Sequence, residues 1–215
     1  MTDKDYTHIA MVVDRSGSMA TIAGDMNGAI LALLGDQAKQ DGYCVVDITT
    51  FDDKIERPYV NVRPDDVKGE VIHPRGLTAL NDALGKTIVE LGERFAAMPD
   101  DERPGLVVFV VVTDGYENHS KEYKTDQVKA MIKEQSERWG WQFMYLATNV
   151  DAFDTGRDYG FDPGSTINFA ASSAGTQNVA GATSNVISKG RSSASRGLKV
   201  NTSYSDEDRE EAMKR

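Results

Sequence analysis

The chain has 215 residues, a length that suits one large domain or two small ones. Hydrophobic residues make up 40% and charged residues 27%, so the chain can build a full apolar core and wholesale disorder is excluded. The formal net charge of -10 repels phosphate, and we expect no nucleic-acid partner. A charge of this sign favours cations, or proteins whose contact surface tolerates an acidic neighbour.

No stretch approaches about 18 unbroken apolar residues, the length of a membrane-spanning helix. The first residues are polar and lack the apolar run of a signal peptide. We therefore expect a cytoplasmic protein with no membrane attachment. The single cysteine, Cys44, excludes an intramolecular disulfide and a cysteine-based zinc site, and its apolar neighbours predict a buried thiol.

Continuous apolar runs predict four strands that are buried on both faces, the pattern of a parallel sheet. These strands cover residues 9–13, 45–51, 107–112 and 141–147. The alternating segment 55–62 contains Pro58, which cannot donate to a strand ladder, so we place it at an edge as the antiparallel partner of the strand before it. A short sixth strand is expected around residues 167–169.

Apolar residues at helical spacing predict three helices between these strands, over residues 19–34, 80–95 and 128–139. A further helix is expected around residues 179–187, inside a segment rich in Ala, Ser and Gly. Strands that alternate with helices in this order predict a doubly wound α/β fold. We expect a mostly parallel six-stranded sheet with one antiparallel edge strand and helices on both faces.

Polar side chains follow the carboxyl ends of two predicted strands and open one helix. Asp14 ends the first strand and is followed by Ser16 and Ser18, Asp114 ends the valine-rich strand, and Thr78 precedes the second helix. Such positions meet at one edge of an open parallel sheet. Two neighbouring carboxylates repel unless a cation lies between them, and carboxylate and hydroxyl oxygens suit Mg²⁺ or Mn²⁺. Each feature alone is an ordinary turn or cap, but together they predict a metal site.

The pattern Asp-x-Ser-x-Ser, then a threonine, then an aspartate resembles the metal-ion-dependent adhesion site of von Willebrand factor A-type domains. The stretches Val-Val-Asp-Arg-Ser-Gly-Ser-Met, Gly-Leu-Thr-Ala-Leu-Asn-Asp-Ala-Leu and Val-Val-Thr-Asp-Gly-Tyr-Glu-Asn resemble the compact bacterial and viral branch of that family. The resemblance covers roughly residues 8–190, and we place the domain at 6–190.

The resemblance implies a binding module rather than an enzyme. In the family, Ser16, Ser18 and Thr78 would reach Mg²⁺ (or Mn²⁺) directly or through water, and Asp14 and Asp114 often bind it through water. The remaining position would be filled by an Asp or Glu of another protein. The chain is acidic, so such a partner requires the ion to invert the local charge.

The predicted partner-binding rim consists of residues next to the metal positions. Tyr116, Glu117 and Asn118 directly follow the second aspartate, and Asn149 follows the fifth strand. For Asn149 and Asp151, an Asx-turn and a helix cap are equally good interpretations. The pair Asp52–Asp53 is interpreted as a solvated hairpin turn, with a second ion site as the alternative.

Two other functions stay open. A metal-dependent hydrolase of the aspartate-nucleophile type would need a second aspartate where Ser16 stands, and no glycine-rich phosphate loop is present. The family resemblance alone implies the other one, an accessory subunit of an AAA+ ATPase, a stress-response system or a viral assembly. Residues 191–215 are expected to form a polar extension, as a short helix or a frayed tail.

Overall fold

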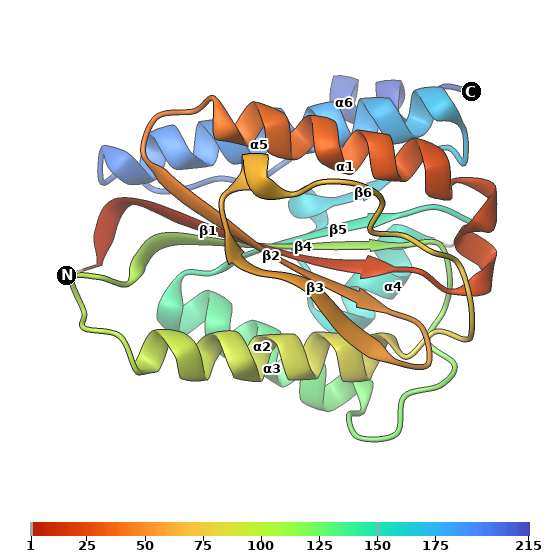
Figure 1. Cartoon of the computed structure of the whole chain (residues 1–215), viewed down its shortest axis with the longest axis horizontal. Coiled ribbons are helices and arrows are strands. Elements are labelled where there is room, and N and C mark those ends of the chain that lie inside the picture. The colour runs from red at the N-terminus through yellow and green to blue at the C-terminus, as the bar shows by residue number, and fades with distance from the viewer. Residues whose placement is uncertain (1, 150) are drawn as a thin grey trace.

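The computed structural model describes residues 2–149 and 151–215 and contains a six-stranded sheet between two layers of helices (Figure 1). The strand order is β3-β2-β1-β4-β5-β6, and only the β2–β3 pair among these neighbours is antiparallel. This arrangement confirms the predicted fold class, including the antiparallel edge strand. The strands are β1 (Asp3–Asp14), β2 (Tyr43–Phe51), β3 (Ile55–Val62), β4 (Pro104–Thr113), β5 (Gln142–Ala147) and β6 (Thr166–Asn168).

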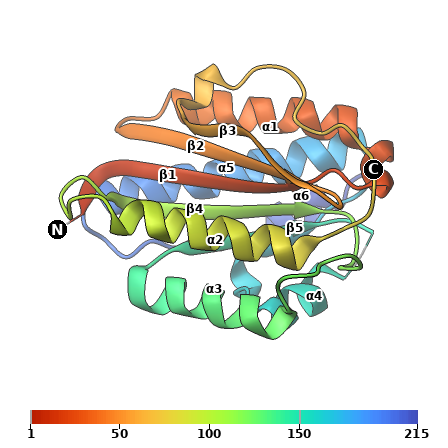
Figure 2. The same cartoon turned by 60° about the horizontal axis from the view of Figure 1, so that its bottom comes forward.

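The helices divide between the two faces of the sheet, as Figures 1 and 2 show. One face is covered by α1 (Ala23–Ala38), α5 (Ser173–Ser195) and α6 (Asp206–Ala212). The other face is covered by α2 (Leu80–Ala96), α3 (Thr125–Trp139) and α4 (Ala152–Tyr159). The short 3₁₀ helices are η1 (Gly17–Thr21), η2 (Pro64–Asp66) and η3 (Pro163–Ser165).

The middle strands contribute side chains to both hydrophobic cores. In β1, Ile9, Met11 and Val13 lie in the core under α1 and α5, whereas Ala10 and Val12 lie in the core under α2 and α3. Successive side chains of a strand point to opposite faces, so a strand covered on both sides has no polar position. This double burial explains why β1 and β4 are continuous apolar runs in the sequence.

The strands β1 and β4 run parallel, but the order in which the chain adds further strands to the sheet changes direction between them. From β1 the chain passes through α1 to β2 on one side, and from β3 it passes through α2 to β4 on the other side. The loops after β1 and β4 therefore diverge from adjacent strand ends, at the right of Figure 1. In open α/β sheets this switch point forms a crevice where ligands bind.

Helix α5 is longer than the sequence predicts. It begins after Ser172, whose Oγ accepts a hydrogen bond from the amide of Gly175 at 3.0 Å, and it continues to Ser195. Val179 and Ile187 belong to the core shared with α1. Apolar packing of this face compensates for the low helix propensity of the Ser, Gly and Asn residues. The domain boundary expected between residues 190 and 191 falls inside this helix.

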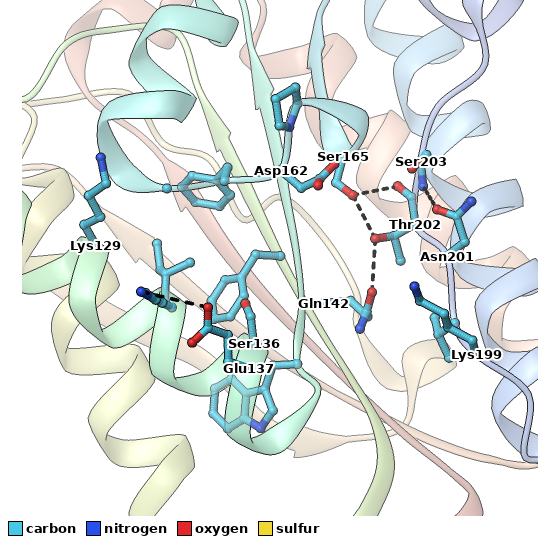
Figure 3. A pocket seen from close by; sticks show the side chains of 18 residues that line it. Lys129, Ser136, Glu137, Gln142, Asp162, Ser165, Lys199, Asn201, Thr202 and Ser203 are labelled. Carbon is cyan, nitrogen blue, oxygen red and sulfur yellow. Dashed lines mark hydrogen bonds and ion pairs between the residues drawn. The ribbon is translucent and has the colours of Figure 1, made fainter.

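The segment after α5 returns along the β6 edge of the sheet. The Ser165 hydroxyl donates to Thr202 O at 3.0 Å, and its Oγ lies 2.9 Å from Thr202 Oγ1 (Figure 3). Tyr204 is buried, with its hydroxyl 2.8 Å from Thr183 Oγ1. Helix α6 follows, and its last residue accepts a hydrogen bond from Ala170 N at 2.9 Å. The predicted short helix is thus present and docked.

None of the helices in the described part of the chain combines the length and the hydropathy needed to cross a bilayer.

Two exposed glycines inside helices are expected to be replaceable with a gain in stability. A Cβ added at Gly28 in α1 or at Gly181 in α5 would meet no atom within 4 Å. Alanine at either position should raise the free energy of unfolding by about 0.5–1 kcal/mol, because glycine loses more backbone freedom on folding. Urea unfolding measures the change.

Gly105→Ala is the matched contrast, since its Cβ would lie 2.8 Å from Lys4 Cα. It should destabilise the protein. A loss of stability in Gly28→Ala would contradict the exposed position of this residue.

Candidate metal centre

Hydroxyl groups connect the carboxyl ends of β1 and β4. After β1 the chain turns into η1 through Ser16 and Ser18, whose Oγ atoms lie 3.0 Å apart. Ser18 donates from Oγ to Oδ1 of Asp114, which directly follows β4, at 2.7 Å. Residues 96 positions apart in the sequence therefore share a hydrogen bond.

The carboxyl group of Asp14 is fully buried beside these hydroxyls. Its Oδ1 accepts from Ser16 N at 2.7 Å, and its Oδ2 accepts from Thr113 Oγ1 at 2.6 Å. Burial raises the pKa of Asp14 to about 6, hydrogen bonds from Thr113 and Ser16 lower it, and the nearby charge of Asp114 raises it further. Ionising the buried carboxyl group of Asp14 therefore costs free energy, and a neighbouring cation would offset this cost.

Asp114 carries an unsatisfied buried oxygen. Among the residues that the structure describes, no hydrogen-bond donor reaches its Oδ2. Burial raises the pKa of Asp114, whereas the Ser18 hydroxyl and the nearby side chain of Asn149 lower it. A buried carboxylate oxygen without a partner is costly, and a metal ion is one partner that would satisfy it.

Thr78 converges on the same point from the loop before α2. A Cβ added at Gly115 would lie 3.7 Å from Thr78 Oγ1 and 3.8 Å from Ser18 Oγ, so both hydroxyls lie close to the residue after Asp114. The backbone of Thr78 is fixed on both sides: its amide donates to Asn118 Oδ1 at 2.9 Å, and its carbonyl accepts from Asn118 N at 3.0 Å. The structure thus brings all five predicted metal positions together.

The predicted rim residues differ in what their side chains contact. Glu117 accepts from the amides of Asn81, His119 and Ser120 at 2.8, 2.8 and 2.6 Å, so its carboxylate holds the loop after β4 against the start of α2. The Asn118 amide oxygen holds Thr78 as described above. The side chains of both residues therefore connect the loop after β4 to the segment around Thr78 and the start of α2.

The other two rim residues face solvent. Tyr116 is 60% exposed, and Asn149 is exposed with a backbone φ of 60°. Asp151, two positions further along the chain, caps α4 by accepting from the amides of Phe153 and Asp154. Among the predicted rim residues, Tyr116 and Asn149 are thus exposed to solvent.

Sequence reasoning missed two residues that shape this site. Thr113 donates a hydrogen bond to one oxygen of Asp14. In the sequence it stands out as the first polar residue after a run of valines, which is the feature that could have identified it. Arg15, inside the Asp-x-Ser motif, is buried and ion-paired to Asp52. The hairpin turn expected at Asp52–Asp53 is present and Asp53 is exposed, but Asp52 is fully buried, so the expectation of a solvated side chain was wrong for Asp52.

The donor set fits a hard divalent cation. Within residues 2–149 and 151–215, no group of three or more His, Cys, Asp or Glu residues is arranged so that it could hold a metal ion, so a thiolate or imidazole centre is not indicated there. The convergent groups are instead carboxylates and hydroxyls, which suit the oxygen coordination of Mg²⁺ or Mn²⁺. Solvent or an external oxygen would complete an octahedral shell around such an ion.

A large cavity lies away from these positions. Its volume is about 830 Å³, and it opens between α3 and residues 199–203 (Figure 3). Gln142 and Phe143 at the start of β5 line it, together with Ser165 before β6. These are the amino ends of the strands, so the cavity is separate from the metal positions.

Solved structures share this architecture at low sequence identity. A structure described as von Willebrand factor type A from Catenulispora acidiphila matches with a TM-score of 0.53 and 11% identity, over 85% of this chain and 42% of that chain. The chain has the von Willebrand factor A-type fold. A pilus adhesin from Lactobacillus rhamnosus GG, in an open conformation, is similar to it with a TM-score of 0.63 and 13% identity, over 85% and 30% of the two chains.

Another A-type match is proximal thread matrix protein 1 from the mussel byssus, in a structure described as having a zinc-occupied metal-ion-dependent adhesion motif. Its TM-score is 0.58 at 14% identity, over 85% of this chain and 46% of that chain. The chain therefore spans less than half the length of these structures. No protein-family model matches the sequence, and no curated protein matches it.

Proposed function

We propose that this chain is a metal-dependent protein-binding module of the A-type fold. In this proposal, Mg²⁺ (or Mn²⁺) is held at the β1–β4 switch point and captures an acidic side chain of a partner protein. The buried, unpartnered Oδ2 of Asp114, placed beside the converging hydroxyls, is the observation that carries the proposal. The metal-holding residues are Asp14, Ser16, Ser18, Thr78 and Asp114.

The charges of the proposed ligands support a bound cation that can still attract an anion from a partner protein. Three of the five proposed ligands are neutral hydroxyls, so the protein supplies only two negative charges to a doubly charged cation. The chain has a net charge of -10 and would otherwise repel an acidic partner. A bound dication inverts the sign of the potential at this point of the surface. Tyr116 would add an exposed aromatic contact beside it.

The matched structures support the same type of function. One is named an adhesin, and another has zinc in its metal-ion-dependent adhesion motif. At 13% and 14% identity, these likenesses concern the fold, and the transfer of metal and partner binding is part of our proposal. A role as the binding subunit of a larger assembly is compatible with it.

Binding is favoured over hydrolysis by the contacts of the serines. Among the hydrogen bonds of the described residues, the hydroxyls of Ser16 and Ser18 bond each other and Asp114, and neither has a histidine partner. A serine nucleophile needs a general base within hydrogen-bond reach. We therefore propose that the site binds and does not catalyse.

Metal binding can be tested with Mn²⁺, whose free form gives a strong electron paramagnetic resonance signal. The wild-type protein should bind one Mn²⁺, and Mg²⁺ should displace it. Thr78→Val, which replaces the hydroxyl with a methyl group of similar size, should weaken binding about tenfold, the effect typical of losing one contact in a metal site. Equal affinity of Thr78→Val and wild type would contradict the assignment of Thr78.

Partner capture is expected to depend on the ion and on Tyr116. Immobilised wild-type protein with Mg²⁺ should retain a partner that EDTA releases. Tyr116→Ala should retain less of it at unchanged Mn²⁺ affinity, because the ring is 60% exposed and Tyr116 is not one of the proposed metal ligands. Ser205→Ala, at the distant cap of α6, is the control. A set of bound proteins that is identical with and without EDTA would overturn the proposed mode of binding.

A further inference from the structure

A ring of four charged side chains joins loops that border the candidate metal centre. Asp52 Oδ2 contacts the Nε atoms of both arginines, at 3.1 and 2.6 Å. The carboxylate of Glu56 accepts from one arginine through each oxygen, at 2.6 and 2.7 Å. Two guanidinium groups and two carboxylates thus alternate in a closed, charge-balanced ring. It consists of Arg15, Asp52, Glu56 and Arg75, and we call it the ionic clamp.

Each member of the ionic clamp comes from a segment that borders the site. Arg15 stands between two proposed metal ligands, Asp14 and Ser16. The two acids lie on the β2–β3 hairpin, Asp52 directly after β2 and Glu56 near the start of β3. Arg75 belongs to the loop that carries Thr78. Ion pairs therefore connect the loop after β1, the β2–β3 hairpin and the loop of Thr78, which are remote from one another in the sequence.

Backbone hydrogen bonds connect the same segments. Arg75 N donates to Arg15 O at 2.8 Å, Gly17 N donates to Gly76 O at 3.3 Å, and Ala79 N donates to Asp52 O at 2.9 Å. Gly76 has a φ of +67°, and a Cβ there would lie 3.2 Å from Asp52 Cβ, so only glycine lets the loop approach the hairpin this closely. Thr78 lies between two of these fixed points.

The ionic clamp has a buried half and a solvent-facing half. Arg15 and Asp52 are buried, whereas the side chains of Glu56 and Arg75 are each 50% exposed. Hydrogen bonds from Arg15 and Arg75 lower the pKa of Glu56 to about 2, so this carboxylate stays charged throughout the neutral range. The inner pair would survive the loss of Arg75, because Arg15 still contacts Asp52.

We propose that the ionic clamp positions Thr78 against the loop of Asp14 and thereby sets the affinity of the metal centre. Its members are positioning residues that do not contact the ion. Outer residues that orient metal ligands typically change affinity by about 10–100-fold when removed. This inference rests on the proposed function, because it concerns the same site.

Arg75→Met tests the ionic clamp. It should weaken Mn²⁺ binding about tenfold, because the loop of Thr78 loses its side-chain anchor. The melting temperature in EDTA should fall by no more than about 3 °C, since half-exposed ion pairs contribute little to stability. Arg75→Lys should recover part of the affinity, as an ammonium group can contact one carboxylate but not both in the guanidinium geometry. In the metal-free protein, amide hydrogens of residues 75–79 should exchange faster in Arg75→Met than in wild type.

The matched control is Arg138→Met, an exposed arginine of α3 paired with Glu134 far from the site. It should change neither the affinity nor the exchange of residues 75–79. Wild-type affinity in Arg75→Met would overturn the proposal. If Arg75→Met unfolds, the Mn²⁺ affinity of Glu56→Gln is compared with that of wild type instead, since this variant removes the other exposed member of the ionic clamp. Wild-type affinity in Glu56→Gln would then overturn the proposal.

A wild-type protein that binds no Mn²⁺ would refute the proposed function and, with it, the effect on affinity. A protein that binds Mn²⁺ equally well with and without Arg75 would refute only the ionic clamp. The two failures are therefore distinguishable.

Discussion

Asp14→Asn is expected to abolish Mg²⁺ binding and, at the same time, to raise the melting temperature of the metal-free protein. Burial raises the pKa of Asp14 from 3.8 in the unfolded chain to about 6 in the fold. A carboxyl group with a raised pKa contributes stability below pH 3.8 and loses it as the pH rises through 6. At pH 7.5 the ionised group therefore costs the fold up to about 3 kcal/mol, which a neutral amide of the same shape avoids.

The gain should be about 1–3 kcal/mol, or several degrees in melting temperature for a chain of this size. Asparagine can keep the hydrogen bond from Ser16 N through its carbonyl oxygen. It removes one of the two negative charges, so the Mg²⁺-induced rise in melting temperature should vanish. Differential scanning fluorimetry in EDTA and in Mg²⁺ measures both effects.

Asp36→Asn is the control, because it removes an exposed carboxylate of α1 that pairs with Lys39 at the surface. It should leave both melting temperatures close to those of wild type. An Asp14→Asn protein that is still stabilised by Mg²⁺ would show that Asp14 is no ligand. One that is less stable than wild type in EDTA would contradict the electrostatic cost assigned to the buried carboxylate.

Arg191→Met is expected to destabilise the protein by about 2–4 kcal/mol, the range for leaving buried hydrogen-bond acceptors without their charged donor. Arg191 is 5% exposed, and its guanidinium group donates to Gln37 O at 2.7 Å, Gln37 Oε1 at 3.2 Å and Asp41 O at 3.0 Å. These bonds join the end of α1 to α5. Methionine fills similar space but leaves the acceptors unpaired.

Urea unfolding of Arg191→Met and Arg196→Met compares a buried with an exposed arginine near the same helix end. Arg196 is exposed and donates to Ser192 O at the end of α5, so its replacement should change stability by less than about 0.5 kcal/mol, as is usual for surface positions. Equal stabilities of the two variants would contradict the buried network between α1 and α5.

The sheet was predictable from the sequence because its strands are covered on both faces. The apolar run 9–13 alternates between two cores in the structure, and double coverage leaves no polar residue to interrupt it. Strand β1 nevertheless begins six residues earlier than residue 9, at Asp3. Its polar start pairs with the end of the sheet near Pro104 and has no apolar signature.

The meeting of the three loops at the site was predictable, since Asp14 ends β1, Asp114 directly follows the adjacent β4, and Thr78 precedes α2 at the same edge. The ionic clamp was not. Asp52 and Arg75 belong to turn segments whose polar composition is typical of exposed loops. The burial of Asp52 depends on its long-range pairing with Arg15 and Arg75, which leaves no periodic signal in the sequence.

The end of α5 was also not predictable from the sequence, because long-range contacts stabilise it. Arg191 lies among Ser, Gly and Lys residues, a composition typical of a solvated linker, and the helix there is held by contacts with α1. Packing between remote segments overrides local propensity in both cases.

Anomalous scattering from a crystal grown with Mn²⁺ tests the central claim most directly. We expect one strong peak between the ends of β1 and β4, at about 2.0–2.2 Å from the hydroxyl oxygens of Ser16 and Ser18, the coordination distance of a small hard dication. A fully occupied Mn²⁺ bound elsewhere, with Asp114 Oδ2 instead contacting a protein donor, would contradict the account.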